Sequence, residues 1–78
     1  SEKKEEFNPE KNGVEGVIAK EGDKYYLEMA GLRFFQLKGN EKVKLEGYVD
    51  KKVKVFGSIE QSEDGNSVLL NVNKVKLQ

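Results

Sequence analysis

Seven residues of this 78-residue chain combine aromatic rings with positive charge, a combination that could bind nucleic acid. Lysine and arginine neutralise phosphates, and aromatic rings stack on bases in proteins that bind single strands. The residues fall in runs where apolar and polar side chains alternate, so every second side chain can share one face of a strand. The candidate ligand-binding residues are Lys24, Tyr26, Arg33, Phe34, Lys52, Lys54 and Phe56.

A purely structural explanation competes for the same residues. Phe34 and Phe35 must place one ring on each face of a strand, and the outward ring can pack under a neighbouring segment. Tyr26 and Phe56 can be cross-strand partners, and alternating lysines protect strand edges. The 14 basic and 14 acidic residues give a formal net charge of +0, whereas nucleic-acid domains usually carry a basic excess. Both explanations stay open, with the structural one favoured.

The residues that usually carry catalysis or bind metals are scarce. The chain has no His and no Cys, which removes imidazole bases, thiolate nucleophiles and the usual zinc sites. The acidic residues lie in expected turns or alternate with lysines, and the acidic turn 60–66 lacks the ligand spacing of a calcium loop. We therefore expect no enzyme, no catalytic residue, no metal site and no cofactor.

The eight glycines indicate how the chain is divided, because from Gly22 onward they recur mostly every eight to ten residues. Short strands separated by tight turns produce this spacing, and the runs between the glycines are rich in residues that favour strands. In the turn 63–66 we expect Gly65 to take the positive-φ position. The pattern predicts five strands, at residues 13–20, 24–29, 32–38, 51–60 and 67–77.

Alternation within these strands predicts which side chains face the core. A bulge near Asn73 would explain why the apolar phase shifts before Val75, and Gly16 would allow a bend in the first strand. The expected inward residues are Tyr25, Leu27, Met29, Val53, Val55, Ile59, Val68, Leu70 and Val72.

The segment 39–51 fits neither a regular strand nor a regular helix. Leu45, Tyr48 and Val49 have the i, i+3, i+4 spacing of a helical face, but Gly47 weakens a helix there. We expect a short, distorted helix, with a short strand through 42–47 as the competitor. Three strands, a helical connection and two further strands are the plan of an OB fold. The predicted fold class is therefore all-β, a five-stranded OB-fold-like Greek-key barrel with a short helical connection between strands three and four.

The chain is short enough for one domain only. Residues 1–12 are charged and hold the single proline, so we expect a flexible charged N-terminal arm at 1–12 and the barrel at 13–78. Packing of Phe7 back onto the barrel is the less favoured alternative. No apolar run is long enough for a membrane span, and no signal-peptide core is present.

The stretch from Gly13 to Leu77 also carries a family-like pattern that includes "KYYL", "KKVKVFG" and "DGN". In this pattern it resembles small bacterial OB-fold proteins of the envelope and lipoprotein type. The resemblance rests on Gly16, Val17, Tyr25, Tyr26, Leu27, Phe35, Leu37, Gly39, Tyr48, Val49, 51–55, Gly57, 64–66, Val72 and Val75. It implies a barrel rather than an activity. Together with the spacer-like arm, it suggests an exported or lipid-anchored protein of the bacterial cell envelope whose signal segment has been removed.

The expected function is a small non-enzymatic OB-fold binding or interaction module whose ligand and partner the sequence leaves unknown; a protein, an oligosaccharide and a single-stranded nucleic acid are the candidates. One alternative is a single-stranded nucleic-acid binding protein that uses the aromatic and basic face of the barrel. Another is a structural or oligomerising barrel whose outward aromatic side chains bury a subunit interface.

Overall fold

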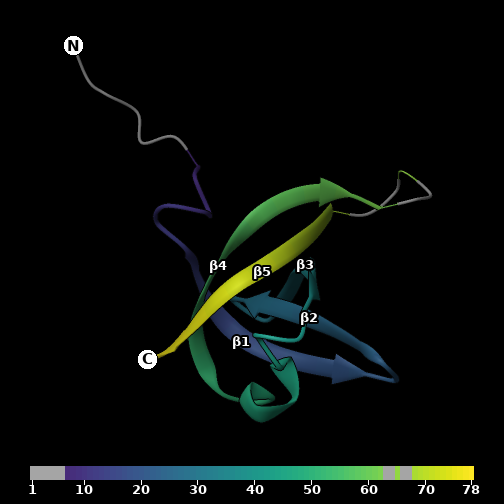
Figure 1. Cartoon of the computed structure of the whole chain (residues 1–78). Helices are drawn as coiled ribbons and strands as arrows, with labels where there is room; N and C mark the ends of the chain where they lie inside the picture. Colours follow the sequence, from purple (N-terminus) through teal and green to yellow (C-terminus); the bar gives the residue numbers. More distant parts are fainter. Residues whose placement is uncertain (1–6, 63–64, 66–67) are drawn as a thin grey trace.

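Five strands close into a barrel in the computed structural model, which describes residues 7–62, 65 and 68–78 (Figure 1). The strands run around the barrel in the order β1-β2-β3-β5-β4, and β4 pairs with β1 to complete it. Their bounds are β1 (Val14–Glu21), β2 (Lys24–Met29), β3 (Leu32–Lys38), β4 (Lys52–Gln61) and β5 (Val68–Leu77). The predicted all-β, OB-fold-like barrel is confirmed.

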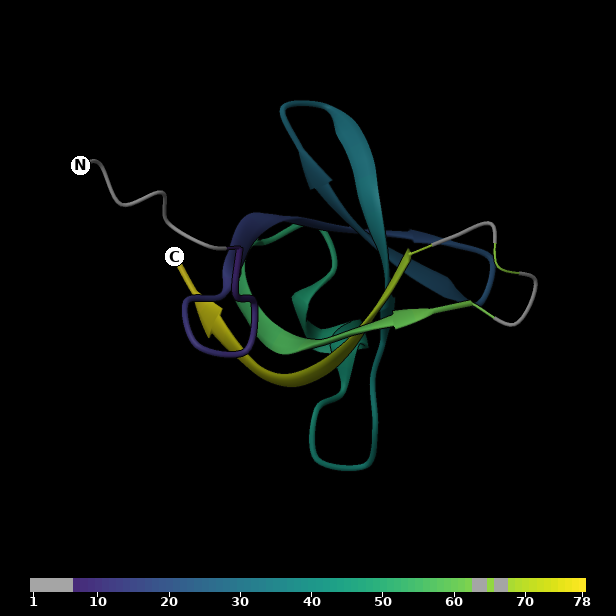
Figure 2. The ribbon, with the colours of Figure 1, turned by 90° about the horizontal axis from the view of Figure 1, so that it is seen from above.

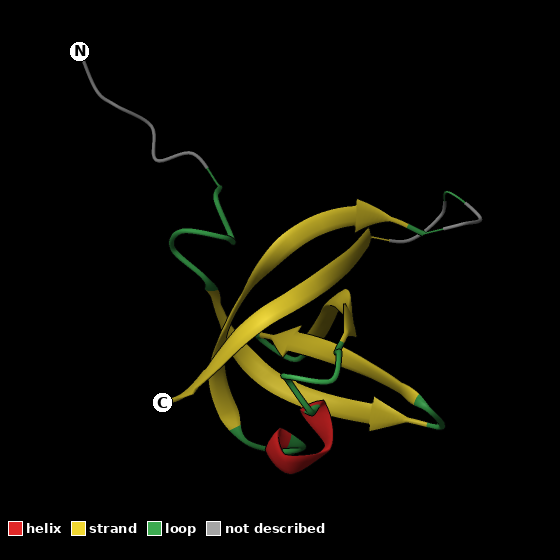
Figure 3. Ribbon diagram, in the orientation of Figure 1, coloured by secondary structure: helices red, strands yellow, loops and turns green. Residues whose placement is uncertain are grey.

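One short 3-10 helix, η1 (Leu45–Tyr48), connects β3 to β4 and lies at one end of the barrel (Figure 3). Leu45 is buried, and Tyr48 and Val49 pack against the core, as the i, i+3, i+4 spacing predicts. Asp50 N–H donates to the Ile18 carbonyl at 2.7 Å, which ties the end of this connection to β1. The predicted short helix is therefore correct, and the competing strand is not formed.

Gly16 allows β1 to pair with two different strands. Residues 14–17 of β1 pair with β4, whereas residues 17–21 pair with β2. A Cβ atom on Gly16 would lie 2.5 Å from the Glu28 carbonyl oxygen, a distance that no ordinary side chain tolerates. Glycine is needed at position 16 because the β2 backbone lies too close to β1 at this bend of the barrel for any side chain to fit.

Two register shifts reorient side chains in the barrel. Phe56 pairs with Lys74 but Gly57 pairs with Val72, so Asn73 is the extra residue of a bulge, as predicted. A second shift lies in the β2–β3 pair, where Leu27 pairs with Phe35 and Glu28 with Arg33. Phe34 is the extra residue there. It is exposed, whereas its neighbour Phe35 packs against the core.

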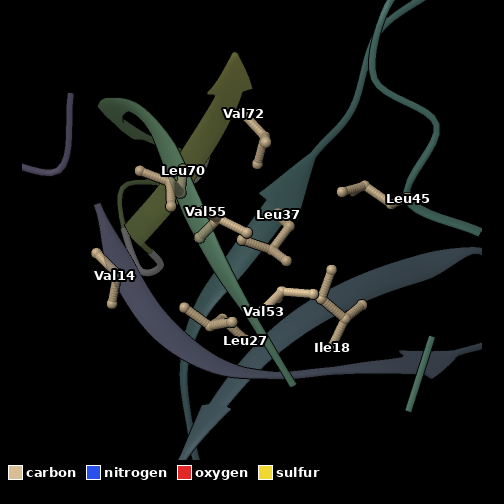
Figure 4. Packing of buried hydrophobic residues seen from close by; sticks show 9 residues of the cluster. All are labelled: Val14, Ile18, Leu27, Leu37, Leu45, Val53, Val55, Leu70 and Val72. Carbon is tan, nitrogen blue, oxygen red and sulfur yellow. The ribbon is translucent and has the colours of Figure 1, made fainter. Parts of the chain in front are cut away.

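The core is formed by aliphatic side chains from all five strands and η1 (Figure 4). The buried residues are Val14, Ile18, Leu27, Leu37, Leu45, Val53, Val55, Leu70 and Val72. Tyr25 and Met29 are half-buried beside them. Most of the predicted inward positions are thus confirmed.

Two predicted core residues are wrong, because Ile59 and Val68 are 44% and 46% exposed. Both lie at the outer end of the β4–β5 hairpin. Beyond Val55, β4 no longer pairs with β1, and residues 58–61 pair only with β5. Figure 2 shows this hairpin extending away from the ring of strands. The apolar alternation of β4 and β5 therefore continues into the end of the hairpin, where there is no core for the side chains to pack against.

The segment 7–12, predicted as part of the arm, contacts the barrel. Pro9 is buried, and its carbonyl accepts a hydrogen bond from Gly57 N–H at 3.2 Å. The Phe7 ring stacks on Phe35, with centroids 6.0 Å apart and planes inclined by 3°. Packing of Phe7 on the barrel, the less favoured alternative, is what the structure shows. The rest of the arm, residues 1–6, lies outside the described residues.

Candidate ligand-binding site

Four of the seven predicted site residues meet at one groove on the outer surface of β2 and β3. The groove has a volume of about 240 Å³ and reaches the first residue of β5. Its lining consists of Lys24, Tyr26, Arg33, Phe34, Phe35, Gln36 and Val68, and these residues are called the β2–β3 groove below. The bulge at Phe34 helps to form it, because the extra residue turns a 51% exposed ring toward the groove.

Arg33 is held in place by three neighbours at the edge of this groove. Its Nε donates to Glu28 Oε2 at 3.3 Å, and its Nη1 donates to Glu21 Oε2. Its guanidinium carbon lies 4.9 Å from the centre of the Tyr26 ring. The pKa of Arg33 is raised, most by its hydrogen bond to Glu21 and next by its hydrogen bond to Glu28. Two carboxylates and one aromatic ring thus orient this guanidinium at the edge of the groove.

The charges around the β2–β3 groove balance. Arg33 is paired with both Glu21 and Glu28, and Lys24 lies directly opposite Glu21 in the pairing of β1 with β2. Two basic side chains are thus matched by two carboxylates on neighbouring strands. A ligand with many negative charges would meet little net attraction at this groove.

The remaining predicted residues, Lys52, Lys54 and Phe56, lie on β4 and form a different surface. Phe56 is half-buried, with Lys54 Nζ 6.0 Å and Lys74 Nζ 4.9 Å from its ring centre. Lys76 lies directly opposite Lys54 on β5. We call this outer surface of β4 and β5 the lysine face; it consists of Lys52, Lys54, Phe56, Lys74 and Lys76. Lys74 and Lys76 are not among the residues predicted from the sequence, although "NKVKL" shows the same alternation as "KKVKV".

The groove and the lysine face do not form the single surface that the sequence suggested. On one side β1 lies between β2 and β4. On the other side Gln36 of the groove pairs with Leu69, five residues before Lys74 on β5. At about 3.3 Å per residue, this separates the two surfaces by roughly 16 Å along the strand.

A third cluster joins β1, β2 and η1 and was not predicted. Glu46 accepts hydrogen bonds from Lys20 Nζ at 3.0 Å and from Tyr25 Oη at 2.9 Å. The hydrogen bond from Lys20, followed by the weaker effect of the bond from Tyr25, lowers the pKa of Glu46. In turn, the hydrogen bond to Glu46 raises the pKa of Lys20 and the pKa of Tyr25. Glu46 is 26 positions from Lys20 and 21 from Tyr25 in the sequence, so no local spacing could reveal the cluster. Their role is to fasten η1 to the barrel.

Within the described residues, no group of three or more His, Cys, Asp or Glu side chains is arranged to hold a metal ion. No helix in the same part of the chain is long and apolar enough to cross a membrane. Comparison with known proteins finds no matching protein family, no matching curated protein and no matching solved structure. The resemblance to envelope OB-fold proteins accordingly stays a prediction.

Proposed function

We propose that this protein is a small non-enzymatic binding module that holds an extended ligand in the β2–β3 groove. The observation that carries the proposal is the grouping of Tyr26 and Phe34 with Lys24, Arg33 and Gln36 around one hollow. Ligand sites combine apolar and aromatic walls with a few polar groups in this way. In OB folds, the surface of the second and third strands is also where oligonucleotides and oligosaccharides bind.

The charge balance of the groove favours an uncharged ligand. Glu21 and Glu28 already neutralise Arg33, so the groove offers little net attraction to a chain of phosphates. Aromatic walls with hydrogen-bonding groups suit a ligand that offers a flat apolar face and hydroxyl groups. We therefore assign the ligand to the class of neutral oligosaccharides rather than to nucleic acids.

Preorganisation of the groove supports this assignment. The Arg33 guanidinium is held by two carboxylates and lies over the Tyr26 ring, so the two side chains brace each other. A ligand would then order few additional side chains on binding, and this saves conformational entropy. Phe34 is the exposed ring that a ligand would cover.

An NMR titration of backbone amide shifts with a panel of neutral oligosaccharides tests the proposal. We expect shifts clustered at Tyr26, Arg33 and Phe34. Phe34→Ala should weaken binding by about tenfold, equivalent to ~1.4 kcal/mol. Leu32→Ala is the matched control: Leu32 is exposed on the same strand but does not line the groove, so affinity should stay unchanged.

Three results would contradict the proposal. Absence of shifts with every neutral oligosaccharide would remove the assigned ligand class. Salt-sensitive shifts in the groove with an oligonucleotide would assign the groove to nucleic acid instead. A mass that rises with protein concentration, with signal loss at Leu32, Phe34 and Val68, would favour the oligomerising barrel.

A further inference from the structure

The lysine face places four ammonium groups on one outer surface of β4 and β5. Lys54 lies directly opposite Lys76, and Phe56 lies opposite Lys74. Lys52 precedes Lys54 by two residues and shares its side of β4, because Val53 between them is buried. Ordinary strand geometry puts such side chains about 7 Å apart along a strand and about 5 Å apart across the pair.

The ammonium groups of this face have no ion-pair partner within the described residues. The ion pairs in that part of the chain involve Lys20 and Arg33 instead. One carboxylate is near, since Glu15 lies opposite Lys54 on β1. Like charges placed directly opposite each other on a sheet are destabilising, as Lys54 and Lys76 are here. A polyanion bound across the face would remove this repulsion.

Phe56 gives the face an aromatic ring among its cations. Both flanking ammonium groups lie within 6.0 Å of the ring centre, and a Cβ atom on Gly13 would lie 2.9 Å from the ring edge. The ring is therefore held between the N-terminal segment and the lysines. An aromatic ring flanked by lysines is the combination with which proteins stack a base and follow the adjoining phosphates.

The surroundings of the face favour a polymer over a membrane surface. Amphipathic surfaces that bind bilayers insert apolar side chains below the headgroups. The next outward pair along the two strands is Ser58 with Asn71, which is polar. We infer that the lysine face is a second binding surface, distinct from the β2–β3 groove, and that it binds the phosphate backbone of a single-stranded nucleic acid. This inference does not depend on the oligosaccharide assignment.

Fluorescence anisotropy with a labelled single-stranded oligonucleotide of mixed sequence, over a series of salt concentrations, tests the inference. Four phosphate contacts predict a slope of log K against log salt of about −2.8, because each contact contributes roughly −0.7 on single strands. The double variant Lys74→Gln, Lys76→Gln should halve the slope to about −1.4. The variant Lys74→Arg, Lys76→Arg should keep it.

The matched control is Lys42→Gln with Lys44→Gln, which changes net charge equally but lies in the loop before η1. Its slope should equal that of the unmodified protein, and Phe34→Ala should also bind the oligonucleotide normally. An equal loss in this control would show that net charge alone acts. Loss on Phe34→Ala would place the nucleic acid in the groove.

Two further results would overturn the inference. One is the absence of oligonucleotide binding at the lowest salt concentration. The other is binding to vesicles that contain phosphatidylserine without binding to the oligonucleotide, which would make an anionic membrane the partner. Because the groove is tested with uncharged sugars and Phe34→Ala, failure of either proposal can be recognised separately.

Discussion

Gly57 of β4 lies directly against the backbone of Asn71 on β5. A Cβ atom at Gly57 would stand 2.0 Å from the Asn71 carbonyl oxygen and 3.0 Å from the Val72 Cα. Gly57 is also the residue whose N–H binds the Pro9 carbonyl. The contact lies at the Asn73 bulge, where β5 has one residue more than β4. Glycine is required because the bulge presses the two backbones together.

Gly57→Ala should therefore destabilise the protein strongly. We expect a loss of about 3 kcal/mol in the free energy of unfolding, at the upper end of what overpacking costs, because backbone rather than a side chain must move. Urea unfolding followed by circular dichroism measures this. Gly47→Ala is the control, since no atom lies within 4 Å of its Cβ position, and its effect should stay within about 0.5 kcal/mol. Equal effects of the two substitutions would show that this contact is absent.

Leu27 and Leu32 test the assignment of the core. Leu27 is fully buried whereas Leu32 is 61% exposed, and they lie on neighbouring strands. Leu27→Ala should lower the free energy of unfolding by about 2–5 kcal/mol through lost burial and the cavity it leaves. Leu32→Ala should change it by less than about 0.5 kcal/mol. Chemical denaturation of both variants checks this, and a large loss at Leu32 would indicate that it is covered in solution.

The Glu46 cluster predicts a pH-dependent contribution to stability. Because Lys20 and Tyr25 lower the pKa of Glu46, its stabilisation is present above the ordinary carboxyl pKa of about 4.3 and is lost as pH falls through the lowered value. Glu46→Gln should thus lower the melting temperature at pH 7, with the difference vanishing in acid. The effect should be modest and should shrink in high salt, since Glu46 is exposed.

Melting temperatures of both proteins between pH 7 and pH 3 check this expectation. Glu41→Gln, in the same connection but outside this cluster, is the control and should leave the melting temperature nearly unchanged at every pH. A deficit of Glu46→Gln that persists at the acid end would mean that packing, not charge, causes it.

The stacked pair of Phe7 and Phe35 predicts that the segment 7–12 stabilises the barrel. Phe7→Ala removes the ring contact and should cost about 0.5–1.5 kcal/mol, although the Phe7 ring is 64% exposed. Phe34→Ala removes a ring of similar exposure that has no stacked ring partner within the described residues, and it should cost less. Thermal unfolding of the two variants compares them. A neutral Phe7→Ala would show that the ring does not stay on Phe35 in solution.

Much of the barrel could be predicted from the sequence, because its signals are local. Alternation identified β2 and β3 with the bounds that the structure has, and the shift of apolar phase on β5 correctly placed the bulge at Asn73. The positive φ of Gly65 is likewise as predicted, at 74°, although residues 63, 64 and 66 of that turn lie outside the described residues. Each of these features depends only on neighbours a few positions away.

Other features could not be predicted because they depend on where the strands end in space. Ile59 and Val68 keep the apolar alternation of their strands, yet the hairpin leaves the barrel there and exposes them. Pro9 is buried through a contact with Gly57, 48 positions further along the chain. Local composition indicates only a charged arm at that point.

The candidate site likewise has features that the sequence predicts and features that depend on the tertiary structure. By itself the sequence determined which residues have the chemistry to bind, since aromatic and basic side chains alternate along single strands. Only the tertiary structure decided how they are grouped: closure of the barrel joins Tyr26, Arg33 and Phe34 at one groove and pairs Lys54 with Lys76 elsewhere. The tertiary structure also decided the net charge of each surface. Glu21 and Glu28 reach Arg33 from other strands and neutralise the β2–β3 groove, whereas the lysine face keeps its positive charge. The physical reason is that alternation specifies a face of one strand, whereas register specifies which faces meet.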